Sequence, residues 1–230
     1  MELQIHNVQL VILRELLFKP KARFSELNSL KLPNDHFVFH LNRLVKEKLI
    51  EKISNRYTLT TSGKEFASLI DTQKTKLERQ ARLSVALHLM RNVKGKVEHL
   101  VHKRLKAPFL GWHGSHSGKI RWGETPLECA RRELLEETGL TGEFHLKSIE
   151  HYFHVHQDGR FLEDKYFWVY KVDNLQGDLI EKTEEGENIW MSEKEYQDLK
   201  NVFAPFVEVD RRMKSKKLVY LDRTEIVDSY

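Results

Sequence analysis

The feature that most constrains this chain is the segment from Gly118 to Leu140, which reads GKIRWGETPLECARRELLEETGL. Five residues separate Gly118 from Glu124, and seven more separate Glu124 from the run Arg-Glu-Leu-Leu-Glu-Glu-Thr-Gly-Leu that begins at Arg132. At average residue frequencies, a chance match to this spaced set has odds on the order of one in ten million in a chain of this length. We therefore interpret the segment as one functional unit.

The centre of this segment predicts one helix. Thr125 suits the N-cap, Pro126 suits the first helical position, and Glu128 completes a capping box. Gly139 can take the left-handed conformation that ends a helix. We expect a helix over roughly residues 126 to 138. The apolar stripe that would pack it on a core consists of Leu127, Ala130 and Leu134.

Three glutamates share one face of this predicted helix. At ~100° per residue, Glu133, Glu136 and Glu137 fall within one arc of ~100°. Carboxylates so close repel each other unless a cation lies among them, and hard oxygen ligands suit Mg²⁺ or Mn²⁺. The alternative is a solvated acidic helix with ion pairs one turn apart. That alternative leaves the spaced glycines unexplained.

With every fixed position filled, the segment resembles the signature box of the Nudix (MutT-like) hydrolases. The resemblance implies a metal-dependent hydrolase that cleaves a diphosphate linkage in a nucleoside diphosphate derivative or a nucleoside triphosphate. The expected cofactor is Mg²⁺ or Mn²⁺, and the expected small-molecule partner is nucleotide-like. The expected fold is an α/β/α sandwich around a mixed sheet.

The resemblance also implies roles for box residues. Glu136 and Glu137 should be metal ligands, and Glu133 should be a ligand or the general base. Arg132 and Glu124 should orient these carboxylates by ion pairing.

The loop before the helix departs from the family pattern, which usually has a glycine pair where this chain has Ser117-Gly118. Ser117 can still offer its backbone carbonyl to the metal. Gly118 and Lys119 are candidates for substrate binding, because backbone near a glycine can approach phosphate closely. The general base varies in the family. Here a carboxylate before Trp190 is a further candidate, with a solvated acidic loop as an equal alternative; the choices are Glu184, Glu185 and, foremost, Glu187.

The N-terminal third predicts four helices and one hairpin. The helices are expected at 5–18, 24–30, 33–49 and from 61 or 62 to 70, and the hairpin strands at 50–53 and 56–59. Phe37, Leu41, Leu44 and Val45 should form the core stripe of the third helix. The strings at 39–44 (FHLNRL) and 57–63 (YTLTTSG) resemble those of winged helix-turn-helix regulators. We therefore expect a winged helix-turn-helix domain at residues 1–71.

Charge supports a separate N-terminal module. Residues 1–70 contain 11 Lys and Arg against 7 Asp and Glu, whereas the remaining residues contain 27 of each. A basic winged helix would bind DNA or RNA through its third helix, with Arg43, Lys46 and His40 facing the nucleic acid. The alternative is a module for a protein partner or a homodimer. Fold alone does not decide between them.

Residues 72–230 are expected to form the Nudix domain with a C-terminal extension, which makes the whole chain α+β. Strands are expected at 81–92, 97–104, 143–156, 161–173 and 188–191, with a helix at 193–200. The basic run at 211–217 reads as a solvated helix or turn, or as an arm that contacts phosphate. His151, His154 and His156 lie on one expected strand and could contact phosphate or zinc.

The sequence disfavours a membrane protein and a secreted protein. No apolar run approaches the ~20 residues of a membrane span, the N-terminus is a poor signal peptide, and the only cysteine is Cys129. These facts favour a protein that is located in the reducing cytoplasm and has no membrane partner.

The rival function is a transcriptional regulator whose Nudix domain senses a nucleotide-like effector. The complete set of box acids argues against that rival, and the substrate itself stays open.

Overall fold

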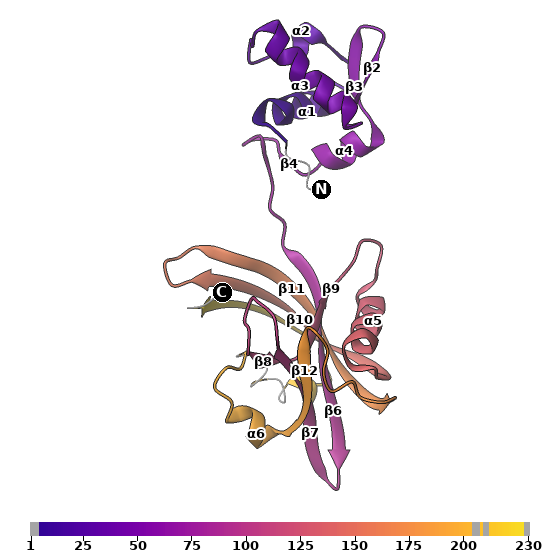
Figure 1. Cartoon of the computed structure of the whole chain (residues 1–230), viewed down its shortest axis with the longest axis vertical. Helices are drawn as coiled ribbons and strands as arrows, with labels where there is room; N and C mark the ends of the chain where they lie inside the picture. The colour runs from indigo at the N-terminus through magenta and orange to yellow at the C-terminus, as the bar shows by residue number, and fades with distance from the viewer. Residues whose placement is uncertain (1–4, 204–207, 209–211, 228–230) are drawn as a thin grey trace. The chain divides into compact units, whose positions relative to one another are not determined.

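The computed structural model describes residues 5–203, 208 and 212–227. The chain divides into two compact units, Met1–Arg79 and Gln80–Tyr230 (Figure 1). Each unit has its own hydrophobic core. Within the described residues, no helix is long and apolar enough to cross a membrane.

The N-terminal unit combines short helices with a small sheet. Its helices are α1 (Asn7–Phe18), α2 (Phe24–Leu27), α3 (Asn34–Lys46) and α4 (Thr61–Ala67). Its strands are β1 (Ala22–Arg23), β2 (Ile50–Ile53), β3 (Arg56–Leu59), β4 (Ile70–Asp71) and β5 (Lys76–Leu77). The first three strands pair in the order β1-β3-β2, and β4 pairs with β5.

The hairpin and the helix order match the sequence prediction, but the helices are shorter. The second helix ends at Leu27, because the Asn28 side chain binds the backbone N–H and carbonyl of Leu32 and turns the chain. Thr60 caps the fourth helix, one residue before the predicted cap.

The prediction for α3 was wrong at two positions. His40 was expected on the exposed face, but it is only 4% exposed, whereas the expected core residue Val45 is 39% exposed. The reason is helical spacing: His40 follows Phe37 by three residues and Leu44 follows it by seven, so all three lie on the buried stripe. His40 stacks on the ring of His6 instead of facing outward.

The C-terminal unit is built around a mixed eight-stranded sheet. Its strands are β6 (Arg82–Val93), β7 (Lys96–Arg104), β8 (His113–Gly114), β9 (His116–Lys119), β10 (Thr141–His156), β11 (Phe161–Gln176), β12 (Gly186–Ser192) and β13 (Val219–Val227). The order is β12-β7-β6-β11-β10-β13, with β8 on β7 and β9 on β6. The pairs β6–β11 and β10–β13 are parallel.

Two helices pack on opposite faces of this sheet. Alternation along β7 places Leu100 in the core that contains Ala130 and Leu134 of α5 (Pro126–Thr138), while Val101 packs on Tyr196 of α6 (Glu193–Gln197). The predicted strands and both helices are therefore present, although β10 and β11 are longer than expected and α6 is shorter.

The basic run at 211–217 was predicted to be a solvated helix or turn, and this is confirmed for Lys214, Lys216 and Lys217, which are exposed; among its described basic residues Arg212 alone is buried. Arg211 lies outside the described residues. Arg212 is 9% exposed, and its Nε lies 3.1 Å from a carboxylate oxygen of the buried Glu150. Burial of a guanidinium requires such a partner, so this part of the run belongs to the core of the sheet.

Candidate active site

The helix α5 has the caps that its sequence predicts. Thr125 and Glu128 form a capping box, Pro126 opens the helix, and Gly139 ends it with φ of 72°. The Glu128 pKa is lowered by its hydrogen bond from the Thr125 backbone N–H. These local signals fix the start and end of the helix, and therefore the position of each carboxylate along it.

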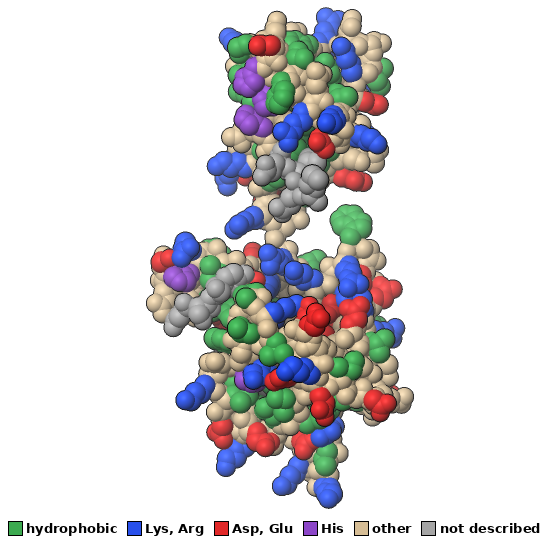
Figure 2. Space-filling model, viewed as in Figure 1, with side chains coloured by type: hydrophobic (Ala, Val, Ile, Leu, Met, Phe, Trp, Pro, Cys, Tyr) green, Lys and Arg blue, Asp and Glu red, His purple; other side chains and the backbone are tan. Residues whose placement is uncertain are grey.

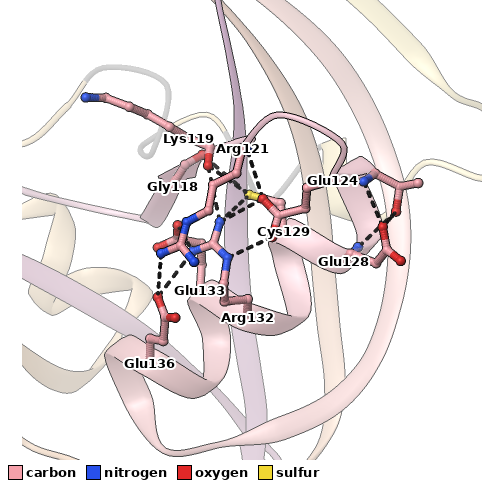
Figure 3. Close-up of polar contacts among 10 residues, drawn as sticks. Gly118, Lys119, Arg121, Glu124, Glu128, Cys129, Arg132, Glu133 and Glu136 are labelled. Carbon is pink, nitrogen blue, oxygen red and sulfur yellow. Dashed lines mark hydrogen bonds and ion pairs between the residues drawn. The ribbon is translucent and has the colours of Figure 1, made fainter.

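Arg132 gathers three acids around one guanidinium (Figure 3). Its Nε donates to Glu124 Oε1 at 2.7 Å and its Nη2 donates to Glu124 Oε2 at 2.9 Å. Its Nη1 donates to Glu133 and, at 3.2 Å, to Glu136 Oε2. The hydrogen bond from Arg132 holds the Glu124 pKa at about 2, so Glu124 is ionised at neutral pH.

Gly118 makes room for one of these acids. A Cβ built on Gly118 would lie 1.8 Å from Cδ of Glu133. Any larger residue would therefore displace the Glu133 carboxylate from the loop. The glycine of the motif is explained here by close packing, because no positive φ is involved.

Glu137 lies apart from the Arg132 cluster. Its Oε2 is buried and has no hydrogen-bond partner among the described residues. Burial, and then the charge of Glu133, raise the Glu137 pKa to about 8. One carboxylate oxygen of Glu137 and one nitrogen from each of His102 and His116 lie within 4.8 Å of one another.

Asn188 ties these groups to strand β12. Its Nδ2 donates to the backbone carbonyls of Glu137 and Ile180, at 2.8 and 2.7 Å. Its Oδ1 lies 2.8 Å from His116 Nε2 and 3.2 Å from His102 Nδ1. Burial lowers the pKa of both imidazoles, that of His116 to about 3, so both are neutral at physiological pH.

Glu187 is not brought to the box carboxylates. It pairs with Lys103 across the β12–β7 ladder, one residue from the Asn188–His102 pair, so alternation turns it to the other face. Its carboxylate lies 2.8 Å from Lys182 Nζ and 3.6 Å from Lys103 Nζ. The Lys182 hydrogen bond is the main cause of its lowered pKa.

Strand β9 separates two environments. His116 and Gly118 face the box helix, whereas Ser117 is exposed and lines a cavity on the other face of the strand. Lys119 contributes its carbonyl, which accepts from Arg132 Nη2 at 3.2 Å, while its side chain extends away from the cluster (Figure 3).

The cavity beyond β9 mixes aromatic and charged side chains. Phe109 and Phe203 pack edge to face, with ring centroids 5.2 Å apart. Glu150 accepts from Tyr152 and Ser148, both at 2.6 Å. The lining includes Ser115, Ser117, His88, His102, Arg104, Phe109, Glu150, Tyr152, His154, Lys165, Phe203 and Arg212.

The strand histidines are held by acids. His154 Nδ1 lies 3.1 Å from Glu163, and His151 Nε2 lies 2.8 Å from Asp164. The His154–Glu163 pair is buried at the cavity, whereas the side chain of Asp164, the partner of His151, is 42% exposed.

In the N-terminal unit, Arg43 and Lys46 are exposed on α3, beside a shallow depression that also includes Phe39 and Asn42. Lys and Arg side chains stand out from several sides of this unit (Figure 2). His40 is excluded from the exposed surface.

The sequence prediction missed His102, His116 and Asn188. His116 directly precedes the Ser117-Gly118 pair, which is a local signal, but nothing local marks the other two. They reach Glu137 only because β7, β9 and β12 are neighbours in the sheet.

The C-terminal unit matches a known protein family. The family model described as the NUDIX domain matches residues 81–212. The chain belongs to the NUDIX family. Its members are hydrolases that act on nucleoside diphosphate derivatives, and the matched region begins within one residue of β6 and includes the whole of α5.

Several solved structures are similar to this chain. A MutT protein from Bacillus halodurans superposes with a TM-score of 0.53 at 22% identity, over 65% of this chain and 93% of that chain. The NUDIX domain of Shewanella oneidensis NrtR, solved with ADP ribose, gives 0.49 at 15% identity, over 68% and 97%. A MutT protein from Methanosarcina mazei Go1 gives 0.48 at 23% identity, over 61% and 100%.

Proposed function

We propose that this NUDIX chain is a divalent-metal-dependent hydrolase that cleaves a diphosphate linkage in a nucleoside diphosphate derivative or a nucleoside triphosphate. The uneven distribution of charge around α5 carries the proposal. Arg132 binds Glu124, Glu133 and Glu136, whereas half-buried Glu137 has a buried oxygen, Oε2, without a hydrogen-bond partner among the described residues. Such an oxygen requires a cation or a proton. The donor set therefore fits a metal ion.

The proposed metal ligands are Glu136 and Glu137, together with the backbone carbonyl of Ser117, and Glu133 is a further ligand or the general base. Bound Mg²⁺ or Mn²⁺ would offset charge on the phosphate oxygens and lower the pKa of the attacking water. Arg132 holds Glu133 and Glu136 in position, and Glu124 fixes Arg132 by two hydrogen bonds. Positioning of this kind accounts for most catalysis of phosphoryl transfer.

For the general base we favour Glu133 over Glu187. Glu133 packs against Gly118 in the loop that precedes the helix. Glu187 is bound by Lys182 and Lys103 on the other face of β12. A base must come within hydrogen-bond reach of the water that it deprotonates.

We place the nucleoside end of the substrate in the cavity beyond β9. Aromatic rings such as Phe109 and Phe203 can pack on a base, and Arg104 and Lys165 supply positive charge for phosphate. The backbone at Gly118 and Lys119 would contact the phosphates between the cavity and the box.

The direct test is a panel of nucleoside diphosphate derivatives and nucleoside triphosphates, assayed with Mg²⁺ or Mn²⁺ and with products separated by ion exchange. The proposal expects cleavage of the diphosphate linkage in at least one compound, and strong loss of that activity in Glu133→Gln. If the folded wild type binds a compound of the panel but hydrolyses none, a sensor is the better description.

A second candidate function follows from the N-terminal unit. We propose that this unit is a winged helix-turn-helix module that binds DNA or RNA, with a protein partner or a second copy as the alternative. The hairpin β2–β3 follows α3 directly, and cations lie on both: Arg43 and Lys46 on the helix, Lys52 and Arg56 on the hairpin. A regulator that senses a nucleotide-like effector would combine both units.

This second proposal is tested by anisotropy titration of duplex DNA and RNA at low and moderate salt. Phosphate contacts release counterions, so binding should weaken steeply with salt. Replacing Arg43 and Lys46 together with Ala should weaken binding but leave hydrolysis unchanged. Absence of binding at low salt, combined with a dimer that the same variant disrupts, would favour the interaction module.

A further inference from the structure

We propose that His102, His116 and Glu137 form a binding site for a first-row transition-metal ion such as Zn²⁺ or Co²⁺, with Asn188 orienting both imidazoles. The site shares Glu137 with the proposed catalytic set, but its occupation does not depend on hydrolysis. Nothing in the box motif requires histidine, so the site would be an addition to the acidic metal set.

The three side chains converge from separate elements. His102 comes from β7, His116 from β9 and Glu137 from α5. One candidate ligand atom from each lies within 4.8 Å of the others. Three atoms bound to one tetrahedral zinc ion at ~2.0–2.2 Å lie ~3.3–3.6 Å from one another, so a shift of less than ~1 Å per side chain would seat an ion.

Asn188 determines which imidazole nitrogens carry protons. Its Nδ2 donates to the carbonyls of Glu137 and Ile180, so its Oδ1 must face the histidines. A carbonyl oxygen only accepts, so His116 Nε2 and His102 Nδ1 must be the donors at 2.8 and 3.2 Å. In a neutral imidazole the other nitrogen then has a lone pair, namely His116 Nδ1 and His102 Nε2.

This is the arrangement that metal sites use to orient histidine. A ligating imidazole almost always donates its other N–H to a carbonyl, carboxylate or water, which fixes the tautomer and the ring orientation. One amide does this for both rings here. The same amide is fixed to the backbone of Glu137, the third candidate ligand.

Unpartnered atoms provide the independent sign of a ligand. His116 is fully buried, and its Nδ1 has no hydrogen-bond partner among the described residues. Glu137 Oε2 is in the same condition. Both atoms carry lone pairs, and buried acceptors without a donor are rare in folded proteins. A cation within the cluster would satisfy both.

The composition of the set indicates the kind of ion. Imidazole nitrogen suits zinc and its first-row neighbours, whereas Mg²⁺ prefers oxygen ligands alone. Two histidines and one glutamate also form a known ligand set of catalytic zinc. His102 lines the cavity beyond β9, so an ion here would lie beside the proposed substrate pocket.

The test measures metal binding directly. Chelator-treated full-length protein is titrated with Co²⁺, Zn²⁺ and Mg²⁺ by calorimetry, and Co²⁺ binding is also followed by visible absorption. The variants are His102→Gln and His116→Gln. The matched control is His99→Gln, which changes another buried histidine of β7 that packs on Tyr196 instead.

We expect one Co²⁺ per wild-type chain and loss of affinity by at least ~10-fold in either site variant, with no loss in the control. Co²⁺ binding no tighter than Mg²⁺ binding in the wild type, or unchanged Co²⁺ affinity in His116→Gln, would overturn the proposal. If the variants fail to fold, a Zn²⁺-dependent rise in the melting temperature of the wild type is the deciding measurement, and its absence also overturns the site.

Failure of this site and failure of the proposed function give different results. Without the histidine site, Mg²⁺-dependent hydrolysis would persist while Co²⁺ absorption is absent. Without the hydrolase, Co²⁺ would bind to a protein that cleaves nothing in the panel.

Discussion

Neighbouring glutamates on α5 have opposite electrostatic surroundings. Glu133 and Glu136 each accept a hydrogen bond from Arg132, whereas Glu137 is turned inward, with its pKa raised to about 8 by burial and by Glu133. Neutral pH therefore leaves Glu137 largely protonated in the absence of the proposed metal ion. Metal binding should accordingly release a proton near neutrality.

We expect Glu137→Gln to lower the hydrolysis rate by at least ~10²-fold, because losing one metal ligand removes several kcal/mol of transition-state stabilisation. Steady-state kinetics at saturating Mg²⁺ measure the effect. The matched control is Glu143→Gln, which changes an exposed carboxylate on β10. Near-normal turnover in Glu137→Gln would remove Glu137 from the ligand set.

Acid should destabilise the NUDIX unit through His88. Burial, and then the charge of Arg212, lower the His88 pKa from 6.5 to about 3. Between these values the unfolded chain binds a proton that the folded chain does not, so the free energy of unfolding falls as pH falls. The expected slope from this group is about 1.4 kcal/mol per pH unit.

His88→Gln should make this slope shallower, because glutamine does not titrate. All four tryptophans lie between residues 112 and 190, so fluorescence-detected urea unfolding reports on the NUDIX unit alone. An equal slope in both proteins between about pH 6.5 and pH 5 would show that His88 is not the group responsible.

Among the elements, α5 was fully predictable because its signals are local. Thr125, Pro126, Glu128 and Gly139 are caps whose effect depends on neighbours within one turn. The hairpin β2–β3 was predictable for the same reason. The short helix α2 was not, because its end depends on the two hydrogen bonds between Asn28 and Leu32.

Sheet pairing explains what the sequence left open in the site. The acids of the box and Arg132 were predicted, since they share one helix. His102 and Asn188 come from paired strands 86 residues apart, and their register places Asn188 rather than Glu187 toward α5. A single sequence does not specify that register.

We expect Thr125→Ala to cost about 1 kcal/mol of stability, because the α5 backbone loses its N-cap acceptor. Urea unfolding followed by tryptophan fluorescence measures the loss. The double variant Thr125→Ala/Glu128→Ala should lose less than the sum of the single variants, because each residue caps the other's backbone N–H. Strict additivity would argue against a coupled capping box.

For the whole molecule, the two separate cores and the uneven charge suggest separate roles for the two units. The excess positive charge lies in the first 70 residues, whereas the box, the histidine cluster and the cavity belong to the unit that begins at Gln80. Neither core contains a residue from the other unit.

A chain that begins at Gln80 should therefore keep hydrolysis of a small substrate within a few-fold of the full chain. The measurement compares kcat/KM of both proteins, with tryptophan fluorescence as the control for folding. A folded truncated chain that lacks activity on every substrate of the full chain would show that the N-terminal unit contributes to the reaction.

Strand β9 and the residue before it offer two sets of positions, and substitutions in one set can accumulate without changing the other. His116 and Gly118 face α5, while Ser117 and Ser115, the residue just before the strand, line the cavity that we propose for the substrate. If the proposed placement of the substrate holds, substitution at 115 or 117 would change which substrate is accepted without altering a carboxylate of the box. An insertion would exchange the two sets. Descendants of this sequence should therefore diversify by point mutation in β9 and keep its length.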